Sequence, residues 1–191
     1  MSSSEPVRLL GLDPVVGDAT VVVILGTFPG PKSLRVGEYY ADRQRNRFWS
    51  IMEKLVPLLG LDYMAAIDEL LQRRIGLWDV IRSCIREGAE DKEIKDPKPN
   101  NLGELLRKHP HVRFVLFNGD PAHEYFTQFV RAGLVEVPAG LSFDTLPSSS
   151  GNNTRSTTLE KAGVWREKLV AAGALVSLED RPAAQEGRKK S

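Results

Sequence analysis

The sequence of 191 residues has few of the residue types that build metal and redox sites. It contains one cysteine, Cys84, which excludes an intramolecular disulfide, an iron–sulfur cluster and a cysteine zinc site. Its three histidines, His109, His111 and His123, do not form a convincing metal-binding set, and we expect no metal and no cofactor. No apolar run approaches the length of a membrane span, and residues 1–6 lack the pattern of a secretion signal. We therefore expect a cytoplasmic protein that does not enter a membrane.

The chain also lacks an excess of charge of either sign. Lys and Arg total 26 against 25 Asp and Glu, so the formal net charge is +1. A nucleic-acid partner would require the basic residues to gather on one face. The length and the 41% of hydrophobic residues fit one α/β domain, which we place at residues 1–178 and expect to be a monomer. Residues 179–191 are polar and basic, and we expect a disordered tail.

Short apolar runs alternate with amphipathic segments along the chain. Strands are predicted at residues 20–25, 112–117 and 141–146, with a strand or buried loop at 75–81. Helices are predicted at residues 47–59, 63–73, 102–108, 121–129 and 158–172. Residues 89–101 are charged and contain two prolines, so we expect an exposed connection there. This alternation predicts an α/β fold, a three-layer α/β/α sandwich with a mostly parallel central sheet.

Three of the predicted strands end in polar, turn-rich loops, at residues 26–37, 118–120 and 147–154. Ligands of such sheets bind outside the carboxyl ends of the strands. We therefore expect the three loops to meet at one site.

The first loop reads G-T-F-P-G-P-K-S-L. Gly26 and Gly30 permit tight backbone geometry, and Lys32 and Ser33 are candidates for holding a phosphate. The alternative is an ordinary turn between a strand and a helix. The spacing of a P-loop is absent from this loop.

The next segment, E-Y-Y-A-D-R-Q-R-N-R-F-W, interleaves aromatic residues with arginines. Tyr40 beside Arg43, Arg45 and Arg47 suits a flipped base and its phosphates, through stacking and charge. Asn46 directly precedes a predicted helix, where asparagine is a favoured N-cap. On the residues alone we interpret Asn46 as a cap, and a catalytic role stays open.

The remaining candidates lie later in the chain. Asn118 follows a buried strand, where its amide suits the edge of a nucleobase, although Asn-Gly pairs are also common in turns. In L-P-S-S-S-G-N-N-T, the hydroxyls of Ser148, Ser149 and Ser150 suit phosphate contacts, and the alternative is a solvated loop. Asp79, inside an apolar stretch, is interpreted as an internal hydrogen-bond acceptor rather than a general base.

Taken in order, these segments resemble the hypoxanthine-DNA glycosylase branch of the uracil-DNA glycosylase superfamily and are similar to mismatch-specific uracil/thymine glycosylases. The resemblance covers roughly residues 20–170 and rests on these motifs: G-T-F-P-G-P-K-S-L, Y-Y-A-D-R-Q-R-N-R-F-W, G-L-W-D-V-I, R-E-G-A-E-D, F-N-G and L-P-S-S-S-G-N-N. It implies a monofunctional enzyme of base excision repair that hydrolyses the N-glycosidic bond of deaminated bases in DNA. Hypoxanthine is the first substrate expected, with uracil and xanthine as further candidates.

The resemblance also implies residue roles. Mismatch-specific relatives carry a catalytic asparagine where this chain has Phe28, so the role of holding water passes to Asn46. The implied base-binding residues are Gly26, Thr27, Phe28, Tyr40 and Asn118, with Tyr40 stacking on the base. The implied DNA-binding residues are Lys32, Ser33, Arg43, Arg47, Ser148, Ser149 and Ser150.

Two other functions stay open at this point. Phe28 displaces the usual catalytic residue, so the protein could bind damaged DNA without catalysis. It could also hydrolyse free nucleosides. A DNA enzyme needs the arginines of residues 43–47 and the serine loop on one face, whereas a nucleoside enzyme has no use for that strip.

Overall fold

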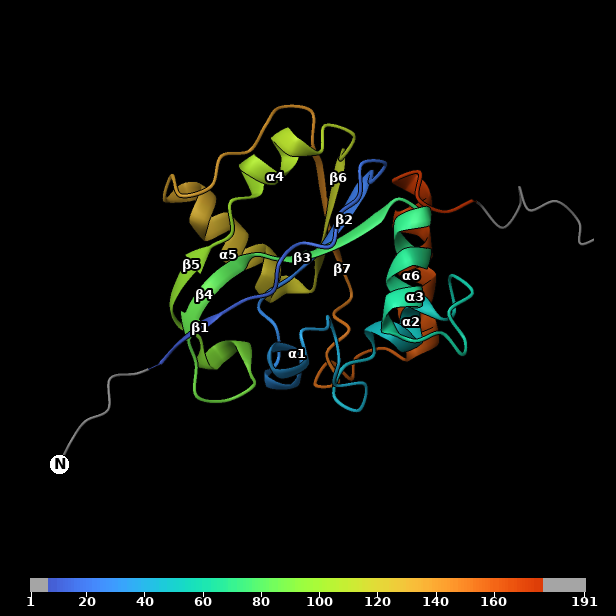
Figure 1. Ribbon diagram of the computed structural model, residues 1–191, viewed down its shortest axis with the longest axis horizontal. Helices are drawn as coiled ribbons and strands as arrows, with labels where there is room; N and C mark the ends of the chain where they lie inside the picture. The colour runs from blue at the N-terminus through green and yellow to red at the C-terminus, as the bar shows by residue number, and fades with distance from the viewer. Residues whose placement is uncertain (1–6, 177–191) are drawn as a thin grey trace, which may run out of the picture.

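A four-stranded parallel sheet lies at the centre of the computed structural model, which describes residues 7–176 (Figure 1). Its order is β3-β2-β6-β7. The strands are β2 (Val22–Gly26), β3 (Ile75–Asp79), β6 (Phe114–Asn118) and β7 (Ser142–Leu146). Each neighbouring pair is parallel, which confirms the predicted sheet. The predicted tail at residues 179–191 lies outside the described residues.

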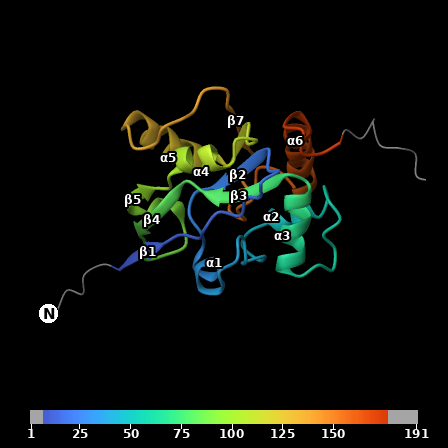
Figure 2. The ribbon, with the colours of Figure 1, turned by 45° about the horizontal axis from the view of Figure 1, so that its top comes forward.

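Helices cover both faces of this sheet (Figures 1 and 2). On one side lie α2 (Phe48–Met52), α3 (Tyr63–Gln72) and α6 (Thr158–Ala171). On the other side lie α4 (Leu102–Lys108) and α5 (Asp120–Arg131). The two inner strands and β3 are buried almost throughout, as expected for strands covered on both faces. The three-layer α/β/α sandwich predicted from the sequence is therefore the observed fold.

A second sheet corrects the prediction for residues 89–101. These residues contain β5 (Lys95–Pro99), which pairs antiparallel with β4 (Ile81–Ile85). On its other edge β4 pairs with β1 (Arg8–Leu10), a short strand that we did not predict. Strand β5 is charged and contains two prolines, which only an edge strand tolerates, so its sequence resembles that of a loop.

The helix predicted at residues 47–59 is also shorter than expected. Helix α2 ends at Met52, and the chain then continues in tight turns, such as the hydrogen bond from the Leu55 N–H to the Met52 carbonyl. Pro57 has no N–H to donate and disfavours helical geometry in the residue before it. Leu55, Val56 and Leu58 are buried all the same, whereas Leu59 is exposed. The spacing of the apolar residues therefore predicted burial through Leu58 correctly, but it predicted too long a helix.

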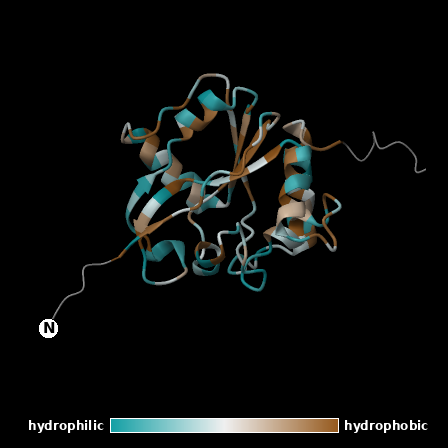
Figure 3. Cartoon of the chain, viewed as in Figure 1, coloured by the Kyte–Doolittle hydropathy of each residue, from teal (hydrophilic) through white to brown (hydrophobic). Residues whose placement is uncertain are grey.

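The hydrophobic core lies between the parallel sheet and the helices. Figure 3 shows the hydrophobic residues concentrated on the central strands. Ile24, Leu77, Phe117 and Trp165 have no exposed surface. None of the helices in residues 7–176 is long and apolar enough to cross a membrane.

The carboxyl ends of the parallel strands are in register. Gly26 is paired with Asp79, and Asn118 is paired with Leu146. The loop after β2 contains the short helix α1 (Pro31–Val36), which the sequence analysis did not predict. Helix α1, the segment that leads to α2 and the loop after β7 all gather at this edge, at the lower end of Figure 1.

Candidate active site

A chain of hydrogen bonds joins three loops at the carboxyl edge of the sheet. The Asn118 side-chain amide donates to the Ser149 hydroxyl at 2.8 Å and to the Tyr40 hydroxyl at 3.2 Å. The Ser149 hydroxyl in turn donates to Asn46 Oδ1 at 2.8 Å. Asn118 Oδ1 accepts the Ser149 N–H at 2.8 Å, so this pair is held at two points. The structure thus brings together four of the residues that the sequence analysis selected.

The side chain of Asn46 has a fixed orientation. Its Oδ1 accepts the backbone N–H of Phe48 at 2.9 Å as well as the Ser149 hydroxyl. A backbone N–H can only donate, so the atom facing Phe48 must be the amide oxygen. Asn46 Nδ2 donates to none of the described residues, and the side chain is half-buried. The N-cap of α2 is Arg47, so Asn46 lies one residue before the position that its predicted capping role required. Its oxygen holds the first N–H of the helix, while its amide nitrogen stays available to a ligand.

The Tyr40 ring lies against that of Phe48. Their centroids are 4.0 Å apart and their planes differ by 10°, so Phe48 covers one face of Tyr40. Tyr40 is half-buried, and its backbone has a φ of 55°. A left-handed backbone costs a non-glycine residue free energy, which the stacking and the hydrogen bond from Asn118 offset. A base can stack only on the other face of this ring.

The end of β2 leaves no room for a side chain at Gly26. A Cβ there would collide with Asp79 Oδ1 and would lie 3.1 Å from the Tyr40 hydroxyl oxygen. Only glycine fits between these two polar atoms. Gly26, Tyr40 and Asp79 therefore meet at one point on the carboxyl edge.

Asp79 corrects the interpretation drawn from the sequence. Its side chain is 4% exposed, yet among the described residues no donor reaches Oδ2. Burial raises the pKa of the Asp79 carboxyl from 3.8 to about 8, repulsion from Asp91 adds to this, and attraction to Arg86 opposes it. The carboxyl group is therefore not the satisfied internal acceptor that we expected.

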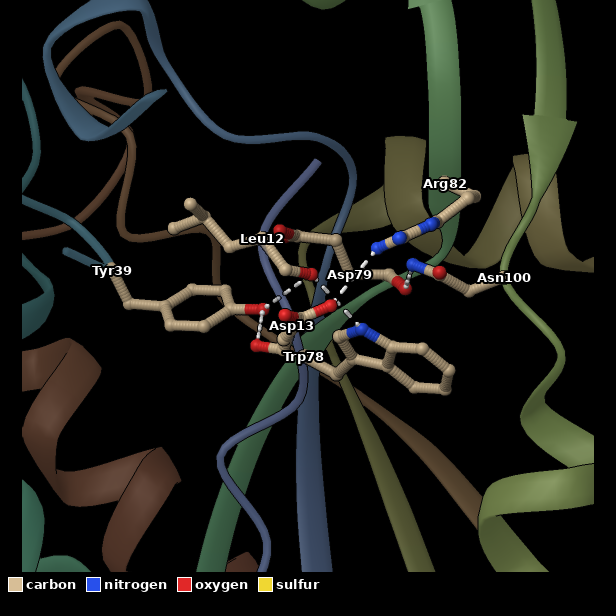
Figure 4. A network of polar contacts seen from close by, with 7 residues as sticks. All are labelled: Leu12, Asp13, Tyr39, Trp78, Asp79, Arg82 and Asn100. Carbon is tan, nitrogen blue, oxygen red and sulfur yellow. Dashed lines mark hydrogen bonds and ion pairs between the residues drawn. The ribbon is translucent and has the colours of Figure 1, made fainter. Parts of the chain in front are cut away.

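The backbone around Asp79 is held firmly (Figure 4). The Asn100 amide donates to the Asp79 main-chain carbonyl at 2.8 Å. The Tyr39 hydroxyl donates to the carbonyl of Asp13 at 3.0 Å, and the Trp78 indole N–H donates to that of Leu12 at 3.3 Å. These contacts fix the direction in which β3 delivers the Asp79 side chain.

Thr27 and Phe28, which the resemblance implied as base-binding residues, both have buried side chains. Phe28 is 7% exposed, and its ring lies under the Arg86 guanidinium at 5.0 Å from the centroid. The Phe28 ring therefore packs inside the protein, and the assignment of Phe28 to base binding stays a prediction. Thr27 is also buried. Burial raises the pKa of the nearby Asp91 carboxyl, and Thr27 opposes this rise.

A buried lysine that the sequence analysis missed holds the serine loop. Lys161 in α6 is 1% exposed, and its ammonium donates to the carbonyls of Ser148 at 2.8 Å and Asn153 at 2.7 Å. One turn further along α6, the Trp165 indole N–H donates to the Pro147 carbonyl at 3.0 Å. Spacing of four residues places both side chains on one helix face, but a helical lysine is usually solvated, so the sequence gave no reason to choose Lys161.

The hydroxyls of the serine loop divide into two kinds. Ser148 Oγ accepts the Ser150 N–H at 3.2 Å, and Ser150 Oγ accepts the Asn152 N–H at 3.4 Å. Both hydroxyls are partly exposed and keep their hydrogen to donate to a ligand. Ser149 has no exposed surface, and its hydroxyl joins Asn118 to Asn46. The predicted contact between Ser149 and DNA is therefore wrong.

The serine loop is bonded directly to the arginine segment. Arg47 N–H donates to the Ser149 carbonyl at 2.8 Å, and Gly151 N–H donates to the Arg45 carbonyl at 2.8 Å. A Cβ on Gly151 would lie 2.8 Å from that carbonyl oxygen, so the two segments approach too closely for another residue. The arginines and the serine loop therefore lie side by side, as a DNA-binding strip requires.

The side chains of Arg43, Arg45 and Arg47 are exposed. Arg43 pairs with Glu53 at 3.6 Å, and Arg47 donates to the Thr158 hydroxyl at 3.3 Å. Exposed contacts of this kind contribute little to stability, so both guanidinium groups can turn to a phosphate at small cost.

Lys32 and Ser33, both in α1, differ in their exposure. Lys32 is exposed and remains a candidate for a phosphate contact. Ser33 is 4% exposed, and its hydroxyl oxygen accepts the Ala41 N–H at 3.1 Å. Ser33 thus fastens α1 to the following segment, which corrects its predicted contact with DNA.

Comparison with known proteins supports the fold and the motifs together. The sequence matches the Uracil DNA glycosylase superfamily over residues 14–185. A hypoxanthine DNA glycosylase from Methanosarcina barkeri is 36% identical over 159 residues, which cover 82% of this chain and 95% of the relative. A hypoxanthine DNA glycosylase from Methanosarcina acetivorans is 34% identical over 149 residues, covering 76% of this chain and 88% of the relative.

A solved structure agrees with these matches. The solution NMR structure of a candidate uracil DNA glycosylase from Methanosarcina acetivorans superposes with a TM-score of 0.67 at 31% identity. It covers 84% of this chain and 98% of its own. Sequence, motifs and fold agree, and the chain belongs to the uracil DNA glycosylase superfamily.

Proposed function

We propose that this protein is a monofunctional DNA glycosylase that removes hypoxanthine from DNA and acts as a monomer in base excision repair. The observation that carries the proposal is the chain from Tyr40 through Asn118 and Ser149 to Asn46, which ends on an amide nitrogen without a partner among residues 7–176. The names of the two Methanosarcina relatives support hypoxanthine as the substrate. Uracil and xanthine are further substrates to test.

The flipped base enters beside Tyr40. A target base inside a duplex must leave the stack before its glycosidic bond can be reached. Phe48 covers one face of the Tyr40 ring, so the base stacks on the opposite face, while Gly26 lies beside the hydroxyl at the edge of the ring. Stacking on an aromatic ring contributes about 1–3 kcal/mol for each base.

Hydrolysis breaks the bond between C1′ and the base nitrogen, and the electron pair leaves with the base. Water adds its oxygen to C1′ and gives up a proton, and the departing base takes up one proton in exchange, so the products are an abasic site and the neutral free base. An amide is too weak a base to take that proton, but its N–H groups can hold the oxygen of a water molecule. Asn46 Nδ2 is the group we assign to this task, while Oδ1 keeps the side chain in place.

Asn118 has a supporting role in this proposal. The resemblance implied that its amide reads the base, yet both of its ends are bonded to Ser149 and its nitrogen also reaches Tyr40. We assign Asn118 to positioning Tyr40 and, through Ser149, the catalytic Asn46.

The DNA backbone lies along the strip formed by the serine loop and the arginines. The hydroxyls of Ser148 and Ser150 and the guanidinium groups of Arg43 and Arg47 are the donors available to its phosphates. This strip favours DNA over a free nucleoside, which has no flanking phosphates to bind.

The test is excision from end-labelled oligonucleotides that each carry one deaminated base, in EDTA, followed by alkaline cleavage of abasic sites. The wild type should cut the deoxyinosine strand and should leave the free nucleoside deoxyinosine intact. A protein that binds the strands but cuts none at stoichiometric concentration would be a damaged-DNA binder.

Asn46→Ser tests the assigned residue. A serine hydroxyl can also accept the Phe48 N–H, so stability should change little, whereas the single-turnover rate should fall about 10²-fold or more. Asn101→Ser is the matched control, because the Asn101 side chain caps α4 by accepting the Glu104 N–H at 3.0 Å. An Asn46→Ser protein that excises at the wild-type rate would return Asn46 to a purely structural role.

A further inference from the structure

Asp79 is a buried titratable group at the base pocket for which the proposed mechanism has no use. It is the last residue of β3 and is paired with Gly26. Its Oδ1 and the Tyr40 hydroxyl oxygen both border the space in which a Cβ of Gly26 would lie. A base stacked on the free face of Tyr40 whose edge extends past the hydroxyl would meet the Asp79 carboxyl there.

Nothing in the described structure satisfies this carboxyl group. Its Oδ2 is buried without a donor, although buried polar groups are hydrogen-bonded in nearly all proteins. Arg86, the cation whose charge lowers the pKa of Asp79, donates instead to the Pro29 carbonyl at 2.7 Å and lies over Phe28. Asp79 therefore has hydrogen-bonding capacity to offer to a ligand.

The groups around Asp79 favour its uncharged form. Four titratable groups interact electrostatically with the Asp79 carboxyl: Tyr39, Tyr40, Asp91 and Arg86. Burial is the largest cause that raises the pKa of Asp79 to about 8, and repulsion from Asp91 adds to it. Attraction to Arg86 opposes the rise only in part. At neutral pH the carboxyl group therefore carries a proton and offers both a donor and an acceptor.

We propose that Asp79 is a second catalytic residue, which donates a hydrogen bond to the flipped base as the glycosidic bond breaks. This inference rests on the proposed glycosylase function. Negative charge builds up on the ring nitrogens and carbonyl oxygens of the departing base, and a buried donor stabilises it most when water is excluded. An ionised carboxylate at the same position would repel the departing base.

The same group favours a chemical class of base. Hypoxanthine, uracil and xanthine each carry a carbonyl oxygen beside a ring N–H. A protonated carboxyl group is complementary to this pair, because its O–H faces the carbonyl while its own carbonyl oxygen accepts the N–H. A carboxylate offers acceptors alone and leaves the carbonyl oxygen of the base unpaired.

The test is the pH dependence of single-turnover excision from a deoxyinosine duplex between pH 6 and pH 9.5. The wild-type rate should fall above pH 8, approaching tenfold per pH unit as Asp79 loses its proton. Asp79→Asn retains a donor that does not titrate, so its rate should stay level across this range. Asp79→Ala should be slower than the wild type by about 10²-fold at pH 6, where the wild type carries the donor, and its own rate should not change with pH, so the gap should narrow above pH 8.

Asp144→Asn is the matched control, because the Asp144 carboxylate is half-exposed and pairs with Lys168 away from the pocket. This control should follow the wild-type profile. Melting temperature and circular dichroism identify variants that fail to fold, and the isosteric Asp79→Asn keeps the test valid if Asp79→Ala is one of them. Asp79→Asn with the same alkaline fall as the wild type, or a folded Asp79→Ala with the wild-type rate, overturns the inference. A wild-type protein that excises no base overturns the proposed function, and this inference with it.

Discussion

Replacing Asp79 with asparagine should stabilise the folded protein, and the gain should grow between pH 5 and pH 7. Burial raises the pKa of Asp79 from 3.8 to about 8, so the folded protein keeps a proton that the unfolded chain releases. Because the folded state binds more protons over this range, its stability falls as the pH rises. The loss is about 1.4 kcal/mol for each pH unit, or roughly 3 kcal/mol between pH 5 and pH 7. An amide has no charge to bury and escapes this loss.

The assay is the melting temperature of both proteins at pH 5, 6, 7 and 8. A change of roughly 3 kcal/mol corresponds to about 6–12 °C for a chain of this length. Any constant cost of burying the amide cancels, because only the change in the difference with pH is compared. Asp144→Asn is again the control, because the bond with Lys168 lowers the pKa of Asp144 from 3.8. Asp144 is therefore ionised in both the folded and the unfolded chain above pH 5, and the difference in melting temperature between Asp144→Asn and the wild type should stay constant there. A constant difference for Asp79→Asn would mean that Asp79 is ionised in the folded protein, and would refute the reasoning.

Three further outcomes are expected for Tyr40, for the arginine segment and for the lysine that holds the serine loop. Tyr40→Ala should slow excision by roughly 10- to 100-fold, the equivalent of about 1–3 kcal/mol of stacking. Tyr40→Phe keeps the ring and should change the excision rate little. A large loss of rate in Tyr40→Phe would mean that the hydroxyl, and not stacking, is what matters. Arg47→Ala should reduce the slope of a plot of log K, the association constant for DNA, against the logarithm of the salt concentration by about one unit. Arg131→Ala, at the far end of α5, should leave this slope unchanged. Lys161→Met should lower the unfolding free energy by roughly 2 kcal/mol, because the partly buried carbonyls of Ser148 and Asn153 lose their donor. An unchanged melting temperature would contradict the role of Lys161.

The strands and their loops could be predicted from the sequence because their signals are local. Continuous apolar runs such as residues 20–25 report burial on both faces, and the polar residues that end them mark the carboxyl edge. The order of the motifs was sufficient to predict the family. Strand β5 was missed because its prolines and charges are compatible with an edge strand that only pairing with β4 reveals.

The division of labour inside the site was decided by tertiary structure. Three neighbouring serines are equivalent in the sequence, yet contacts from Asn118 and Asn46 bury Ser149 completely and leave Ser148 and Ser150 partly exposed. Those contacts join residues far apart along the chain, so no local pattern reports them.

Asp79 gives the same lesson for electrostatics. The sequence showed a carboxylate in an apolar stretch, which is compatible with a satisfied acceptor or with a perturbed acid. The register of β3 against β2 aims this side chain at Gly26, and the fold brings Asp91 near without supplying a donor to Oδ2. The pKa of a buried group depends on which distant groups share its surroundings, and only the packed structure determines that.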